Sequence, residues 1–148
     1  MTGSPARIVV DTNVLVSGLL FGGVPGRLIE LGAQGRLQII ATRAILQEYI
    51  RVLAYPKFKL TKAEIRGLLD EVILPLVEAV RVDAVPAVIG ADHSDDEFLA
   101  AAAAGSVEAI ISGDRHLLAL KTYQGIPIET AAEFLRRYEG SPAAGQRR

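Results

Sequence analysis

The 148-residue sequence contains no cysteine. This absence excludes disulfide-stapled scaffolds, thiol redox enzymes and thiolate zinc sites. The two histidines, His93 and His116, are isolated in the sequence, so no histidine pair has metal-ligand spacing. Positive and negative charges nearly cancel, with 16 Lys and Arg against 17 Asp and Glu. A net charge of −1 argues against a broad basic face for long nucleic acid, but it is compatible with a small catalytic footprint.

Long apolar runs are also missing. The N-terminal apolar stretch at residues 8–21 is interrupted by Asp11, Thr12 and Asn13. A transmembrane helix needs about 20 apolar residues, and the apolar region of a secretory signal carries no carboxylate. With 50% hydrophobic residues, the chain is expected to bury a sizeable core. We therefore expect a soluble, cytoplasmic protein.

Short apolar, β-branched runs alternate with segments of helical periodicity along the chain. The third strand has two alternative positions, and strands are predicted at 7–10, 37–41, 80–82 or 85–89, 109–112 and 126–128. This alternation predicts an α/β fold with three layers, α/β/α, around a central, mainly parallel five-stranded sheet. Residues 1–139 are expected to form a single domain, and residues 140–148 a disordered C-terminal tail.

Several residues mark where helices begin or break. Ser or Thr followed three residues later by Glu predicts capping boxes at Thr61, Ser94 and Thr130. Thr42 is a further candidate N-cap. Pro75 is expected to kink or split the helix that Thr61 opens.

Acidic residues lie where the predicted strands end. Asp11 directly follows the first strand, Asp95 and Asp96 open the helix after the third, and Asp114 follows the fourth. Glu48 lies at the margin of the apolar stripe of the helix after the second strand. Ligands of parallel sheets bind outside the carboxyl ends of the strands. We therefore expect these carboxylates to gather at one edge of the sheet.

Such a cluster needs a counter-charge. At ~4 Å and an effective dielectric constant of ~20, each like-charge pair costs about 4 kcal/mol, so protons or a cation must neutralise the group. Oxygen-only ligands suit Mg²⁺ or Mn²⁺ better than zinc. Because carboxylate-held Mg²⁺ most often serves phosphoryl or phosphodiester chemistry, the pattern predicts a metal-dependent phosphohydrolase.

Each acid also has a structural interpretation. Asp95 could serve only to favour a helix N-terminus, Asp114 could be a helix N-cap, and Glu48 could be a solvated helix residue. The helix that follows Asp11 could be capped by Thr12 rather than by Asp11. The basic residues nearby are expected to form a solvated face: Arg43, Arg51, Lys57, Lys59 and Lys62.

Other Asp-dependent folds fit less well. Phosphatases of the haloacid-dehalogenase type use D-x-D-x-T/V, but here Asn13 and Leu15 occupy the second Asp and the Thr/Val positions. The phosphoacceptor Asp and Lys of a receiver domain are not apparent, and no glycine-rich nucleotide-binding loop occurs.

Five segments in order resemble the motifs of PIN-domain nucleases. The resemblance covers about residues 7–138 and is closest to the bacterial and archaeal branch of toxin–antitoxin toxins, the VapC-like proteins. The segments are 8–15 (IVVDTNVL), 42–49 (TRAILQEY), 92–99 (DHSDDEFL), 110–118 (IISGDRHLL) and 126–135.

The resemblance implies a Mg²⁺- or Mn²⁺-dependent endoribonuclease that leaves 5′-phosphate and 3′-hydroxyl ends. Asp95 is favoured over Asp96 as the third acid because it stands three residues before Phe98, the family's spacing. Thr42 and His93 replace the serine and proline common in this branch. The implied catalytic and metal-binding acids are Asp11, Glu48, Asp95 and Asp114, with Asp96 as fallback. The polar residues that would orient them are Thr12, Asn13 and Ser112.

The resemblance also implies partners: an RNA substrate, a second copy of the chain in a homodimer, and a small antitoxin that inserts a segment into the acidic groove. The alternatives are a PIN-like binding module with little catalysis, or a different Mg²⁺-dependent phosphohydrolase. Candidate RNA phosphate contacts are Lys57, Lys59, Lys62, Arg115 and Arg137.

Overall fold

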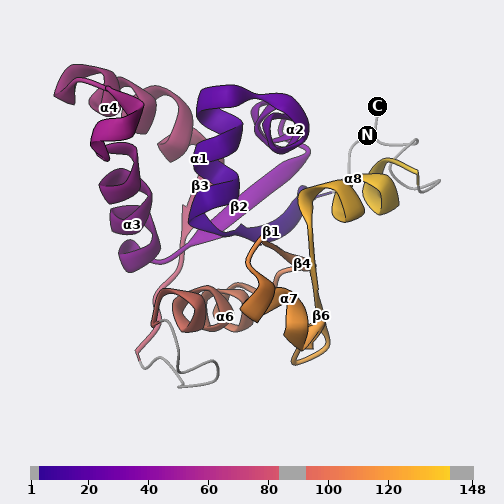
Figure 1. Ribbon diagram of the computed structural model, residues 1–148. Coiled ribbons are helices and arrows are strands. Elements are labelled where there is room, and N and C mark those ends of the chain that lie inside the picture. The colour runs from indigo at the N-terminus through magenta and orange to yellow at the C-terminus, as the bar shows by residue number, and fades with distance from the viewer. Residues whose placement is uncertain (1–3, 84–92, 141–148) are drawn as a thin grey trace.

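A six-stranded sheet forms the middle layer of the computed structural model, which describes residues 4–83 and 93–140 (Figure 1). The strand order is β3-β2-β1-β4-β6-β5, and every neighbouring pair is parallel except β5 and β6. The strands are β1 (Ala6–Val10), β2 (Leu37–Ala41), β3 (Val77–Ala79), β4 (Ala109–Ile111), β5 (Thr122–Tyr123) and β6 (Ile126–Glu129).

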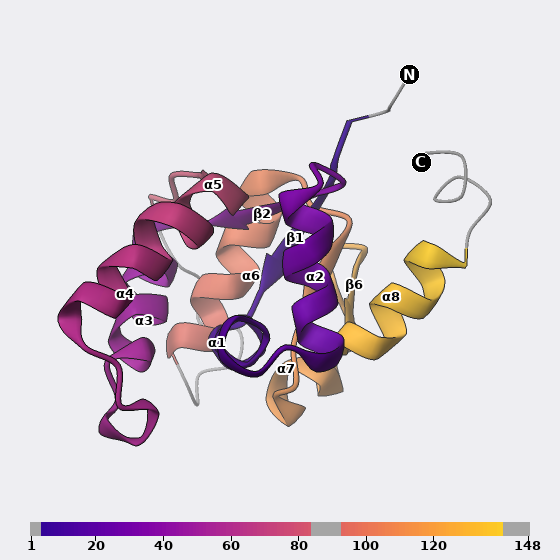
Figure 2. The same ribbon diagram turned by 90° about the horizontal axis from the view of Figure 1, so that it is seen from above.

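Helices cover both faces of this sheet, which confirms the predicted three-layer α/β/α fold. In Figure 1, α1 and α2 lie on one side of the sheet and α6 lies on the other; α8 packs against α2. Figure 2, seen from above, shows α1 and α2 in front of β1 with α6 behind it. The helices are α1 (Thr12–Phe21), α2 (Gly23–Ala33), α3 (Arg43–Leu53), α4 (Lys62–Leu68), α5 (Leu74–Leu76), α6 (His93–Gly105), α7 (Arg115–Leu120) and α8 (Ala131–Glu139).

The central strands are apolar on both sides because both faces are covered. In β1, Ile8, Val9 and Val10 are buried, as is all of β4. β1 and β4 pair with Val10 opposite Ile111. The residues that follow, Asp11 and Ser112, therefore leave the sheet next to each other at the same edge.

The helices α1 and α2 meet at a sharp bend of 88°. Gly22 and Gly23 connect them with φ angles of 71° and 65°, a region that glycine enters without a steric penalty. Gly18 of α1 lies so close to α2 that a Cβ atom there would be 2.8 Å from the carbonyl oxygen of Pro25. In the described part of the chain no single helix is long and apolar enough to cross a membrane; α1 and α2 pass that test only as a bent pair, by length and composition.

The predicted strand at 80–82 and the predicted number of strands are wrong. β3 occupies Val77–Ala79, because the preceding helix ends at Leu76 and pairing with β2 begins at once. Val80 adds only one further hydrogen bond, from its N–H to the carbonyl of Ala41, and residues 85–89 lie outside the described residues. The sheet has six strands instead of five because β5, with two residues, is too short to leave a pattern.

Most helix signals are confirmed. Thr42 caps α3, and the capping boxes of Thr61 with Glu64 and Thr130 with Glu133 both form. α6 begins at His93, one residue before Ser94, but the Ser94 side chain is not among those that the structure describes, so the capping box there stays a prediction.

The helix that contains Pro75 is irregular, because a π-helical segment lies just before the proline. This segment, η2 (Leu69–Ile73), connects α4 to α5, and the N–H of Leu74 donates to the carbonyl of Leu69 at its end. Proline has no N–H to donate, so the regular ladder cannot continue through position 75. Earlier in the chain, a short 3₁₀ turn, η1 (Pro56–Phe58), joins α3 to α4.

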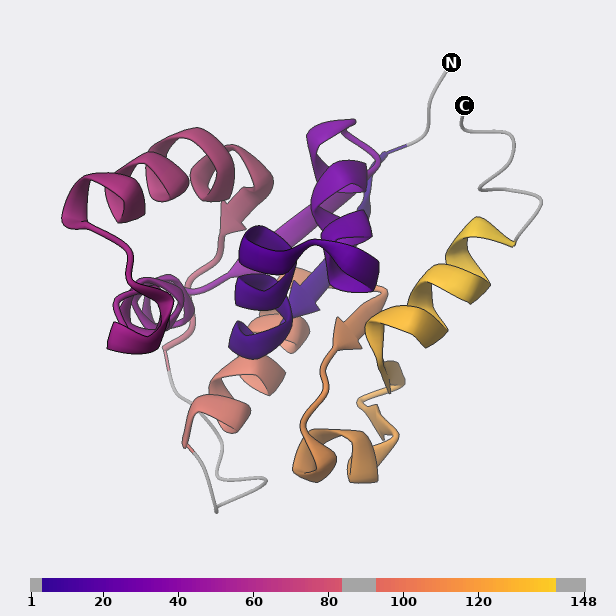
Figure 3. The same ribbon diagram turned by 45° about the horizontal axis from the view of Figure 1, so that its top comes forward.

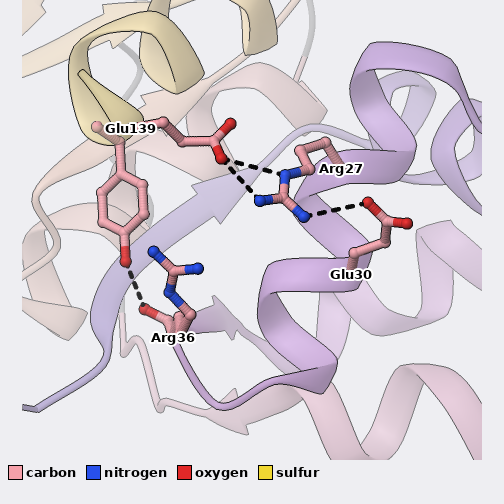
Figure 4. Close-up of polar contacts among 5 residues, drawn as sticks. Arg27, Glu30, Arg36 and Glu139 are labelled. Atoms are coloured by element: carbon pink, nitrogen blue, oxygen red, sulfur yellow. Dashed lines mark hydrogen bonds and ion pairs between the residues drawn. The ribbon is translucent and has the colours of Figure 1, made fainter. Parts of the chain in front are cut away.

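The last helix is attached to α2 by polar contacts (Figure 4). Arg27 Nη2 lies 2.7 Å from Glu139 Oε2, and its Nη1 lies 3.4 Å from Glu30 Oε1. The Arg27 guanidinium holds the pKa of Glu139 below its usual range. The hydroxyl of Tyr138 donates to the carbonyl of Arg36 at 3.3 Å. These contacts fix α8 on the face that α1 and α2 cover.

The close crossing of α1 and α2 gives a stability test. Gly18→Ala should destabilise the fold by about 1–3 kcal/mol, since the obstructing atoms belong to the backbone near Pro25 and cannot rotate away. Gly67→Ala in α4 is the matched control: no atom lies within 4 Å of the added Cβ, so a gain of about 0.5–1 kcal/mol is expected. Urea unfolding of both variants measures the difference, and equal stabilities would contradict the packing described.

Candidate active site at the carboxyl edge of the sheet

Asp11 is the first residue after β1, and its buried carboxylate accepts three hydrogen bonds. The N–H of Val14 donates to Oδ1 at 2.9 Å. The hydroxyl of Ser112 and the N–H of Gly113, at 3.2 Å, donate to Oδ2. Asp11 therefore caps α1, and the prediction that Thr12 could be that cap is wrong because Thr12 is already helical. The same carboxylate also ties the end of β1 to the loop after β4.

Asp114 is connected to Asp11 through Ser112. The N–H of Asp114 donates to the Ser112 hydroxyl oxygen at 2.9 Å, while that hydroxyl donates to Asp11. Asp114 Oδ1 accepts from the N–H groups of His116, at 2.7 Å, and Leu117, at 3.3 Å. The structural interpretation of Asp114 as an N-cap, here of α7, is thus confirmed. The predicted orienting role of Ser112 agrees with these contacts.

The environment of Asp11 opposes its ionisation. Burial raises the pKa of Asp11 above its ordinary range, and the nearby charge of Asp114 raises it further. Hydrogen bonds from Ser112, Val14 and Gly113 stabilise the charged form but do not cancel the effect of burial. A positive charge added next to this carboxylate would stabilise its ionised form.

Glu48 is half-buried on α3, and its carboxylate binds an arginine of the same helix. Arg51 Nη2 lies 2.7 Å from Glu48 Oε2 and 2.8 Å from Oε1, and Arg51 Nε lies 3.0 Å from Oε1. The sequence predicts Arg51 as part of a solvated face; the guanidinium is indeed exposed, but it is engaged by this acid. The structure therefore places Glu48 with Arg51.

The start of α6 lies at the same edge of the sheet. The hydroxyl of Thr42, just after β2, donates to Glu97 Oε1 at 3.5 Å. This contact places the first turn of α6, which holds Asp95 and Asp96, beside the carboxyl end of β2. Both aspartates are buried. The predicted first-turn position of the two acids is confirmed.

Two further predicted residues flank Asp11. Thr12 is buried, and its hydroxyl makes no hydrogen bond in the described part of the protein. Asn13 is exposed on the first turn of α1. Neither forms a hydrogen bond to an acid among the described residues, so an orienting role for these two residues stays a prediction. Among the candidate phosphate contacts, Arg137 pairs with Glu129.

The oxygen donors at this edge fit a hard dication in chemistry, but they are not assembled around one point. An ionised carboxylate has about four acceptor positions, and Asp11 uses three of them. Both hydrogen bonds to Asp114 fall on Oδ1. Among residues 4–83 and 93–140, no three acidic or histidine side chains lie close enough to hold one ion. The described side chains therefore do not by themselves form a complete ligand set.

Tyr49 is a site residue that the sequence analysis missed. Its ring is buried, and its hydroxyl donates to the carbonyl of Val10 at 2.6 Å, one residue before Asp11. Burial and the negative charge of Asp11 raise the pKa of Tyr49, so the hydroxyl stays protonated as a donor. The only signal in the sequence is that Tyr49 follows Glu48 on the apolar stripe of α3.

The hydrogen bond from Ser112 to Asp11 can be tested by titration. Ser112→Ala removes a donor that stabilises the ionised carboxylate, so the pKa of Asp11 should rise further. The native state holds this proton more tightly than the unfolded chain. Its contribution to stability is therefore complete at low pH and is lost as the pH rises through the raised pKa.

Carbon-13 NMR of the aspartate carboxyl groups measures this pKa directly. Thr12→Val is the matched control, because it removes a neighbouring hydroxyl that makes no hydrogen bond in the described structure and should leave the titration of Asp11 almost unchanged. A lower pKa of Asp11 in Ser112→Ala than in the wild type would refute the role given to Ser112.

Comparisons with known proteins agree with this geometry. The structure is similar to that of PAE2754 from Pyrobaculum aerophilum, with a TM-score of 0.60 and 17% identity over 95% of this chain and 93% of that one. It is also similar to the PIN domain endonuclease Utp24, with a TM-score of 0.50 and 14% identity over 86% and 87% of the two chains. No curated protein matches the sequence. At these identities the likeness shows a shared fold, but the sequence profile of the PIN domain matches residues 7–116. The chain therefore belongs to the PIN domain family.

Proposed function

We propose that this PIN domain is a Mg²⁺- or Mn²⁺-dependent endoribonuclease. PIN domains are typically nucleases, and the similar Utp24 is named as an endonuclease. One observation carries the proposal: the buried carboxylate of Asp11 is bonded to the loop that carries Asp114. Two neighbouring strand ends thus deliver two acids to one place where a positive charge is favoured.

The residues around Asp11 hold its carboxylate in one orientation. The Val14 N–H fixes Oδ1, and the Ser112 hydroxyl donates to Oδ2 while its own oxygen accepts from the Asp114 N–H. Tyr49 fixes the backbone just before Asp11. Rigid support of this kind is what a catalytic ligand needs to keep its geometry during the reaction.

Asp11 and Asp114 are proposed as the principal metal ligands, with Asp95 and Glu48 completing the set and Asp96 as the alternative to Asp95. When bound, the dication would supply Lewis-acid activation of water and offset negative charge on the phosphate under attack. When ionised, these acids make the site anionic, so an RNA phosphate enters only where a cation offsets their charge.

A binding module with little catalysis is the second candidate. The observation that favours it is that Asp11 and Asp114 both cap helices, while Glu48 is bound by Arg51. Each of these contacts has a structural purpose of its own. The two candidates differ in one measurable property, which is metal-dependent cleavage of RNA by the purified protein.

We further propose, on the resemblance of the motifs alone, that the protein is the toxin of a toxin–antitoxin pair and acts as a homodimer. A small antitoxin would then place a basic segment against the carboxylates. Expression with and without the product of the neighbouring reading frame tests this role: growth arrest that the second protein relieves supports it, and growth unaffected by the chain alone contradicts it.

The activity itself is tested by Asp11→Asn. Asparagine caps helices as well as aspartate does, so α1 should keep its cap and the fold should persist, with some loss of stability because the amide nitrogen cannot accept the bonds from Ser112 and Gly113. Loss of the negative oxygen should reduce Mg²⁺-dependent cleavage of labelled single-stranded RNA by more than about 100-fold. Asp70→Asn is the matched control, since Asp70 is an exposed acid that pairs with Arg66 on the same helical segment.

Circular dichroism checks that both variants are folded. Cleavage by folded Asp11→Asn at the wild-type rate would refute the assignment of Asp11. Absence of metal-dependent cleavage from the wild-type protein itself would favour the binding module.

A further inference from the structure

The ion pair between Glu48 and Arg51 gives one of the proposed metal ligands a positively charged partner within the protein. Three contacts of 2.7–3.0 Å join the guanidinium to both oxygens of the carboxylate. The two residues are three positions apart on α3, so the contact forms within one helix and requires no other part of the fold. The carboxylate has its counter-charge before any ion arrives.

The two partners differ in how they are held. The Glu48 side chain is 22% exposed and the Arg51 side chain is 59% exposed, so the acid lies on the protein side of the pair and the guanidinium on the solvent side. Arg51 Nη1 also donates to the hydroxyl of Tyr55 at 3.1 Å, and its guanidinium lies 5.6 Å from the centre of the Tyr55 ring. Tyr55 thus gives Arg51 a second support that does not involve Glu48.

A contact of this kind is weak. Exposed ion pairs contribute little because water screens them, and pairs three residues apart on a helix contribute less than most. A dication held by several carboxylates competes easily with a single exposed guanidinium. The contact can therefore occupy Glu48 in the resting protein without preventing ion binding.

We propose that Arg51 is a positioning residue that holds Glu48 in a resting position and is displaced when a dication binds. The proposal rests on the function proposed above, because it requires Glu48 to be a metal ligand. Arg51 keeps the Glu48 carboxylate paired until an ion replaces the guanidinium. Affinity for the ion is therefore lower than the acids alone would give.

Calorimetric titration with Mn²⁺ alone, without RNA, tests this role. Arg51→Ala should bind Mn²⁺ about two- to fivefold more tightly than the wild type, the range expected for loss of one weak competing ion pair. Arg51→Lys keeps the charge but loses the two-pronged contact, so its affinity should lie between the two. If Arg51→Ala is poorly folded, Arg51→Lys carries the same test.

Arg43→Ala is the matched control for charge. Arg43 is an exposed arginine on the first turn of the same helix, and its removal changes the net charge by the same amount. The second control is Glu48→Gln. In that background Arg51→Ala should not raise the affinity for Mn²⁺, because the carboxylate for which Arg51 and the ion compete is gone. This double-mutant cycle isolates the contact between the two side chains.

The outcomes separate the two proposals. Wild-type protein that binds no Mn²⁺ overturns both the proposed function and the role of Arg51. Wild-type protein that binds Mn²⁺, with Arg51→Ala no tighter than Arg43→Ala, overturns the role of Arg51 alone. A gain specific to Arg51→Ala that disappears in Glu48→Gln supports both.

Discussion

The hydrogen bonds between Asp11 and the Ser112–Gly113 segment are the contacts on which the site depends. They exist because β1 and β4 are parallel neighbours in a register that pairs Val10 with Ile111. Asp11 and Ser112 must then leave the sheet together, and Asp114 follows within the same loop. The core of the sheet thereby sets the position of the acids, as Figure 3 shows for the central strands beneath α1 and α2.

Structural and chemical uses of Asp11 are compatible in this geometry. Capping α1 requires an oxygen that accepts the Val14 N–H, and bracing the loop after β4 occupies the other oxygen, yet an ionised carboxylate still has an acceptor position left. Burial raises the pKa of Asp11. A cation bound at the remaining acceptor position would therefore stabilise the ionised carboxylate. The cap and the proposed ligand are therefore one group.

The sequence predicts the elements whose signal is local. Buried parallel strands such as β2 leave continuous apolar runs, and the caps at Thr42, Thr61 and Thr130 leave fixed spacings. The position of β3 depends on where the preceding helix ends, which is at Leu76. Valines also follow β3 in the sequence, so the apolar pattern alone does not locate the strand. The partner of Glu48 also cannot be predicted from the sequence pattern. The spacing on the helix allows the Glu48 side chain to reach either the edge of the sheet or Arg51, and only the structure shows that it contacts Arg51.

Whether carboxylates from separate strand ends share one dication is measured most directly by anomalous scattering from crystals soaked in Mn²⁺. We expect a peak at direct-coordination distance, about 2–2.5 Å, from oxygens of both Asp11 and Asp114. A clear map in which Asp11 keeps only its bonds to Val14, Ser112 and Gly113, with no peak between the two acids, would contradict it.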